Sequence, residues 1–226
     1  MTRPDEPGID DLDHPARHPV LRAYGRGPDA RSTEIPSGRG VPTWLDSMIR
    51  YCSRCGGALM FGTVAGEDRD RLTCSNCGHI AYVNPRLVVT TLPITASGEV
   101  VLLRRGLDPG RGSWAQPGGF LEVDESVSEA AIRETYEETG LVIEPGEIVG
   151  LYTRLEAAVV VIAFESRVIG GRFRLNPEAL EITAFAPDAI PWPGIAFRTS
   201  RMAIQDWLRL RHPHLAGTVE VGGAGE

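Results

Sequence analysis

Residues 118–143, GGFLEVDESVSEAAIRETYEETGLVI, predict a helix with both of its ends defined. Ser126 and Glu129 form an S-x-x-E capping box, which places the start of the helix at Ser126. Gly140 supplies the stop, because glycine readily adopts the left-handed backbone that ends helices. We therefore expect a helix over Val127–Thr139.

Three glutamates of this helix, Glu134, Glu137 and Glu138, lie at i, i+3 and i+4 and so share one face. Like charges at this spacing destabilise a helix by about 0.2–0.5 kcal/mol per pair. Arg133 is the nearby cation, and its position favours a pair with Glu129 or Glu137 over neutralisation of all three acids. A bound Mg²⁺ or Mn²⁺ would supply the missing positive charge. An acidic surface helix, common in a protein with a pI of about 5.3, explains the spacing equally well.

The four cysteines of the chain form two C-x-x-C pairs separated by 18 residues, Cys52 with Cys55 and Cys74 with Cys77. This pattern favours a tetrahedral four-cysteine zinc site with a structural or docking role, because a closed shell leaves no position for substrate. Disulfides are the alternative, but they need an oxidising compartment. His79 follows the last pair, and four thiolates already complete the shell without it.

Apolar, β-branched runs predict five strands, and a second helix is expected near the end of the chain. The order of strands, a helix, more strands and a closing helix favours an α/β fold with a mixed sheet. The predicted strands are Leu87–Ile94, Val100–Leu103, Ile148–Tyr152, Ala157–Phe164 and Ile182–Phe185, and the closing helix is Ser200–Arg211.

Composition divides the chain into a globular middle and two loose ends. Residues 1–45 are rich in proline and lack helical or strand periodicity, so we expect a disordered leader there. After it we expect a zinc ribbon over 48–84, an α/β domain over 85–212 and a flexible tail over 213–226. A net charge of -7 argues against nucleic acid as a partner. The sequence also lacks a membrane-spanning run and an N-terminal signal peptide, so cytoplasm is the expected compartment.

Residues 119–141 match the pattern G-x5-E-x7-R-E-U-x-E-E-x-G-U, where U is a bulky aliphatic residue, and so resemble the Nudix box. Thr135 is the departure, at a position where the pattern asks for an aliphatic residue that packs the helix on the sheet. The matching positions are Gly119, Glu125, Arg133, Glu134, Glu137, Glu138, Gly140 and Leu141.

The resemblance implies an α/β/α sandwich and a metal-dependent attack on diphosphates. It assigns Mg²⁺ to the three glutamates of the helix with help from the carbonyl of Gly119, and gives Arg133 and Glu125 the role of orienting those carboxylates. In this family the general base is either a box glutamate or one on a later loop. Glu178 is the first loop candidate and Glu181 the second; the alternative for both is an ordinary glutamate that precedes a strand.

Features outside the box narrow the resemblance to ribbon-bearing Nudix hydrolases described as ADP-ribose or FAD pyrophosphatases. These features are the ribbon itself and the segments Ile80–Pro85, Pro177–Glu181 and Ile190–Phe197. The S-Q-P-W-P-F-P-x-S segment of the NADH pyrophosphatases is missing after the box, which weakens that assignment without excluding it. A homodimer is one expected assembly, because many relatives are dimers.

The resemblance therefore implies a Mg²⁺-dependent enzyme that hydrolyses the diphosphate of a small nucleotide derivative and releases a nucleoside monophosphate. A non-catalytic nucleotide sensor is the rival, although such a protein is expected to lose box glutamates, and this chain keeps them. Four aromatic side chains could stack on a nucleobase or flavin, but each is also a candidate for a plain core position: Trp114, Phe120, Tyr152 and Phe197. Arg104 and Arg105 could contact a phosphate, and solvated charges at the end of a strand explain them equally well.

Overall fold

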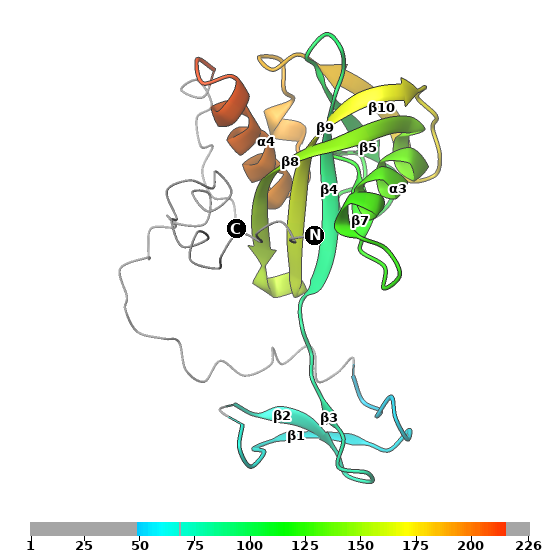
Figure 1. Cartoon of the computed structure of the whole chain (residues 1–226), viewed down its shortest axis with the longest axis vertical. Coiled ribbons are helices and arrows are strands. Elements are labelled where there is room, and N and C mark those ends of the chain that lie inside the picture. The colour runs from blue at the N-terminus through cyan, green and yellow to red at the C-terminus, as the bar shows by residue number, and fades with distance from the viewer. Residues whose placement is uncertain (1–48, 68, 216–226) are drawn as a thin grey trace, which may run out of the picture. The chain divides into compact units, whose positions relative to one another are not determined.

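The computed structural model describes residues 49–67 and 69–215 (Figure 1). The chain divides into two compact units: the smaller includes the described residues up to Pro85 together with Glu156–Ala158, and the larger includes Arg86–Leu155 and the described residues from Val159 on. The predicted leader lies outside the described residues, as do residues 216–226 of the predicted tail. Across the described ranges, no helix combines the length and the apolar character needed to cross a membrane.

The small unit is a three-stranded antiparallel sheet in the order β1-β2-β3. Among its described residues, the buried apolar side chains are Cys52, Leu72 and Cys74. Because so little apolar surface is buried, a metal is the expected source of its stability. The strands are β1 (Leu59–Gly62), β2 (Arg71–Cys74) and β3 (Ile80–Ala81).

The larger unit is built around a sheet whose main strands are ordered β10-β5-β4-β9-β8. Strands β4 and β9 are parallel and the other pairs are antiparallel, so the sheet is mixed, as predicted. The strands are β4 (Arg86–Ile94), β5 (Val100–Arg105), β6 (Trp114–Ala115), β7 (Gly118–Phe120), β8 (Leu141–Arg154), β9 (Val159–Gly171) and β10 (Ala179–Phe185). The other elements are α3 (Val127–Thr139), α4 (Arg198–Arg211) and the 3-10 turns η2 (Leu155–Ala157) and η3 (Trp192–Gly194).

Helices α3 and α4 cover opposite faces of this sheet (Figure 1). On strand β4, Val89 packs in one cluster with Ala130 of α3, whereas Leu92 packs in another with Trp207 of α4. A strand points successive side chains to opposite faces, so β4 contributes to both cores. The result is an α/β/α sandwich.

Both predicted helices are present. Helix α3 has the predicted bounds: the side chain of Ser126 accepts from the amide of Glu129 and the side chain of Glu129 accepts from Ser126, while Gly140 ends the helix with φ 76°. Helix α4 begins at Arg198 rather than at Ser200. Three predicted strands lie within slightly longer ones, β4, β5 and β10.

The other two strands differ from the prediction at their starts. The strand expected from Ala157 begins at Val159, because Ala157 belongs to η2 and Ala158 turns the chain with φ 47°. The strand expected from Ile148 begins at Leu141. Register shifts between Pro145 and Ile148 interrupt the regular pairing of β8 with β9, and with it the alternation from which a strand is predicted.

Thr135, the departure from the Nudix box pattern, is fully buried between α3 and the sheet. Its hydroxyl donates to the carbonyl of Ala131 at 2.7 Å and lies 2.7 Å from the hydroxyl of Thr91 on β4. Since the proton of Thr135 is used on Ala131, Thr91 is the donor between the two hydroxyls. A hydrogen bond therefore joins helix and sheet where an aliphatic contact was expected.

We expect Thr135→Val to lower the free energy of unfolding by about 1–3 kcal/mol, because the hydroxyl of Thr91 would lose its acceptor inside the core. The double variant Thr91→Val/Thr135→Val should recover most of that loss, since valine matches threonine in shape. Urea denaturation of the single and double variants measures both effects. Equal losses in the two would show that the hydroxyl pair is not the cause.

Candidate active site

Strand β7, which precedes the loop into α3, contacts two of the three helix glutamates. The backbone N–H of Gly118 donates to Oε2 of Glu138 at 2.8 Å. A Cβ added to Gly119 would lie 2.4 Å from Oε1 of Glu134, so any other residue there displaces that carboxylate. This close approach explains why a glycine stands at the first position of the box.

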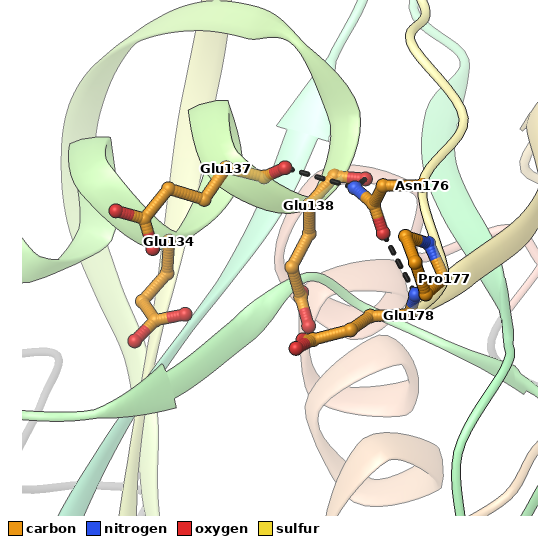
Figure 2. A pocket seen from close by; sticks show the side chains of 6 residues that line it. All are labelled: Glu134, Glu137, Glu138, Asn176, Pro177 and Glu178. Carbon is orange, nitrogen blue, oxygen red and sulfur yellow. Dashed lines mark hydrogen bonds between the residues drawn. The ribbon is translucent and has the colours of Figure 1, made fainter.

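Four glutamates line one pocket of about 220 Å³ (Figure 2). Three come from α3 and the fourth from the segment that enters β10. The carboxylates of Glu138 and Glu178 point toward one another, while Glu134 and Glu137 extend to the other side. The lining residues are Glu134, Glu137, Glu138, Asn176, Pro177 and Glu178.

Arg133 links this pocket to the loop before α3. Its guanidinium binds both carboxylate oxygens of Glu125, at 2.9 and 2.5 Å, and that pairing lowers the pKa of Glu125 to about 2. The same guanidinium lies 2.7 Å from Glu134 and 3.3 Å from Glu137. The predicted pair with Glu137 is therefore present, whereas Glu129 is bound to Ser126 in the capping box.

Burial raises the pKa of two of the helix carboxyls. For Glu138, which is 9% exposed, burial and the charges of Glu134 and Glu178 raise the pKa to about 7, although the N–H of Gly118 opposes the shift. Burial also raises the pKa of Glu134, against the effect of Arg133. These carboxylates need further positive charge to stay ionised together. An oxygen donor set of this kind fits a divalent cation such as Mg²⁺ or Mn²⁺.

The two loop glutamates lie in different surroundings. Glu178 reaches the pocket, and its charge contributes to the raised pKa of Glu138. Glu181, on β10, is not among the residues that line the pocket, and it pairs with Arg104 at 3.5 Å, with about half of each side chain exposed. Position in the pocket therefore favours Glu178 over Glu181 as the loop base.

The aromatic candidates divide between core and partly open positions. Tyr152 is a core residue, 4% exposed, and its hydroxyl donates to Asp206 of α4 at 2.9 Å. Trp114 packs edge to face with Phe185, and the guanidinium of Arg86 covers Phe120. The ring of Phe197 lies next to the guanidinium groups of Arg105 and Arg154.

The four cysteines of the small unit gather into one cluster. Their Sγ atoms all lie within 4.8 Å of one another, and the 3.8 Å between Cys52 and Cys77 and the 3.5 Å between Cys55 and Cys74 are far too long for disulfides. Within residues 49–67 and 69–215, no other group of three or more His, Cys, Asp or Glu side chains meets this spacing. The carboxylates of the acidic pocket are thus more widely spread than the thiols.

Backbone amides point at the thiols, as a metal site requires. The amides of Arg54 and Asn76 donate to Cys52 and Cys74 at 3.3 and 3.4 Å. The amide of Gly57 lowers the pKa of Cys55 to about 6. The amide of His79 also lowers the pKa of Cys77, but the neighbouring thiols outweigh it and raise that pKa to about 12. Four thiolates at this distance need a cation such as Zn²⁺ between them.

Comparison with known families assigns both units. The family model described as the NUDIX domain matches residues 84–202, which is more than half of the chain. The chain belongs to the Nudix hydrolase family. A second model, described as the Nudix N-terminal zinc ribbon, matches residues 50–83, so the ribbon predicted from the cysteines is confirmed.

Individual relatives agree with this family. The chain is 33% identical over 135 residues to an ADP-ribose pyrophosphatase of Methanocaldococcus jannaschii, a match that covers 58% of this chain and 78% of the relative. It is 27% identical over 144 residues to the NAD-capped RNA hydrolase NudC of Pseudomonas aeruginosa, covering 63% of this chain and 49% of NudC, so it spans about half of that protein. The crystal structure of a Nudix hydrolase from Nitrosomonas europaea superposes with a TM-score of 0.69 at 32% identity, covering 73% and 93% of the two chains.

The Nudix helix α3 and the loop before it bring together the residues that the sequence singled out, Glu125, Arg133 and the three helix glutamates. Two pocket residues, Asn176 and Pro177, were not predicted from the sequence. The Asn-Pro pair before a strand is itself a turn signal, and it stands next to Glu178, so this pair was the available clue.

We expect the purified Nudix protein to hold about one zinc ion per chain in its ribbon. Cys77→Ser should lose that zinc, because a closed tetrahedral site needs four ligands, while the helical circular dichroism should persist, since both described helices belong to the larger unit. Mass spectrometry of the metal content measures the loss. Ser75→Ala, next to the cluster but outside it, is the matched control, and full zinc content in Cys77→Ser would contradict the site.

Proposed function

We propose that this Nudix hydrolase uses Mg²⁺ to hydrolyse the diphosphate of a nucleoside diphosphate joined to another group, such as ADP-ribose or FAD, and releases a nucleoside monophosphate. The observation that carries the proposal is the pocket in which three helix glutamates and Glu178 meet. The similarity to the M. jannaschii protein named ADP-ribose pyrophosphatase supports the choice of substrate class.

In this proposal Glu134, Glu137 and Glu138, with the carbonyl of Gly119, would hold the metal. When bound, the metal would supply positive charge to offset the negative charge of the diphosphate as water attacks one phosphorus. The chain's own groups keep these ligands in place. The N–H of Gly118 fixes one oxygen of Glu138, and Arg133, itself held by Glu125, binds Glu134 and Glu137.

Glu178 is the proposed general base. It accepts a proton from the attacking water as the new P–O bond forms, and the bond from that phosphorus to the bridging oxygen breaks, leaving two phosphate monoesters. The support is its place in the pocket, facing Glu138.

NADH is a second candidate substrate, because the chain is also similar to a protein named NAD-capped RNA hydrolase, whose name includes the NAD group. It shares the nucleoside diphosphate with ADP-ribose and FAD, so the same pocket would serve. A nucleotide sensor would bind one of these compounds without turning it over. The same proposal places the protein in the cytoplasm, gives it a small-molecule nucleotide as its partner and includes a homodimer as its assembly.

The test is release of AMP from ADP-ribose, FAD and NADH, with nucleoside triphosphates in the same panel. We expect turnover of at least one dinucleotide-like substrate with Mg²⁺, and none after EDTA. Glu138→Gln should lower kcat on the order of 10²-fold, because it removes a charged ligand from the reacting centre. Binding without turnover across the panel would favour the sensor and reject the enzyme.

Glu178→Gln should lower kcat on the order of 10²-fold or more, within the range of general-base effects, with little change in KM. The matched control is Glu181→Gln, which removes the same charge three residues later, on β10 and outside the pocket, and its kcat should stay near that of the unsubstituted enzyme. Steady-state kinetics at saturating Mg²⁺ compares the two. Unchanged turnover in Glu178→Gln would exclude this residue as the base.

A further inference from the structure

The segment that carries Glu178 enters the acidic pocket from a part of the chain remote from the Nudix helix. It joins β9 to β10, and one side chain in it, Asn176, touches both the segment and α3. Figure 2 shows Asn176 between the end of α3 and Glu178. The position of Glu178 in relation to the helix glutamates therefore depends on how Asn176 is held.

The amide nitrogen of Asn176 binds the end of α3. Its Nδ2 donates to the backbone carbonyls of Glu137 at 2.9 Å and Glu138 at 3.1 Å. Carbonyls in the last turn of a helix have no partner within the helix, and the last turn of α3 contains no basic residue. Asn176 thus supplies a neutral donor to the backbone of two pocket glutamates.

The amide oxygen of Asn176 fixes the segment that follows. Its Oδ1 accepts from the backbone N–H of Glu178 at 2.8 Å and of Ala179 at 3.0 Å. This is the local turn that asparagine side chains form with the residues after them. The backbone of Glu178 is therefore tied to the same amide group that binds α3.

A second contact holds the segment to the backbone that follows β5. The N–H of Gly106, directly after β5, donates to the carbonyl of Glu178 at 2.7 Å. A Cβ on Gly106 would lie 1.9 Å from the carbonyl oxygen of Pro177, so the two backbones are as close as they can be. The segment is therefore held at Gly106 and, through Asn176, at the end of α3.

We propose that Asn176 is a positioning residue, which acts on catalysis by holding Glu178 against the end of the Nudix helix. The inference rests on the proposed function, in which Glu178 is the base. Only a neutral side chain with both a donor and an acceptor at this length fits. Aspartate keeps the acceptor but places a negative charge against the helix carbonyls, where the helix dipole is also negative.

The test is a double-mutant cycle that combines Asn176→Ala with Glu178→Gln. In the chain with Glu178, Asn176→Ala should lower kcat about tenfold or more with KM nearly unchanged, because a displaced base loses its alignment. In the Glu178→Gln background, the same change should lower kcat by less than about twofold, because the base is already absent. Asn176→Asp should resemble Asn176→Ala. Leu175→Ala, an exposed neighbour in the same segment, is the control and should leave kcat unchanged.

Amide hydrogen exchange gives a readout that does not depend on turnover. Asn176→Ala should raise the exchange rate at the amide of Glu178, which loses its acceptor, and leave the middle of α3 as protected as before. Equal losses of kcat in both backgrounds, or unchanged exchange at Glu178, would overturn the inference. Full turnover by Glu178→Gln would instead reject the base assignment in the proposed function, and the catalytic role of Asn176 with it.

Discussion

Negative charge concentrated in the last two turns of α3 is the constraint around which the larger unit is arranged. A helix does not by itself tolerate Glu134, Glu137 and Glu138 side by side, and burial makes their ionisation harder still. Cationic and N–H groups around the helix bind these carboxylates and offset their negative charge. Arg133 binds two of the carboxylates and the amide of Gly118 binds the third.

Those contacts come from every part of the larger unit. The sheet supplies Gly118 through β7, the loop before α3 supplies Glu125 to orient Arg133, and the segment before β10 supplies Asn176. The arrangement of the pocket is therefore coupled to the fold of the sheet.

Sequence reasoning located α3 and its glutamates because capping signals and helical spacing are local. It located the zinc ribbon because four cysteines at fixed spacing have few alternatives. It did not locate Asn176, whose partners lie 38 and 39 residues away along the chain. It also placed the start of β8 too late, because the bulges near Pro145 hide the alternation of that strand. Local patterns were enough where one element acts alone, and failed where two distant elements meet.

The choice between Glu178 and Glu181 shows the same limit. In the sequence Glu178 ranks first and Glu181 second, but a separation of three residues does not say which one faces the helix. Pairing of β10 with β5 separates their surroundings, since Glu181 lies opposite Arg104 while Glu178, just before β10, lines the pocket.

Strand β4 has a consequence for how the larger unit tolerates change. It sends Val89 and Thr91 toward α3 and Leu92 toward α4, so a slip of one residue would bury the hydroxyl of Thr91 against Trp207 and remove the acceptor partnership with Thr135. Because β4 also pairs with Gly118 and Gly119 of β7, the same slip would move these two glycines away from the carboxylates. Insertions in the central strand are thus penalised twice, once in packing and once in the alignment of the reactive groups.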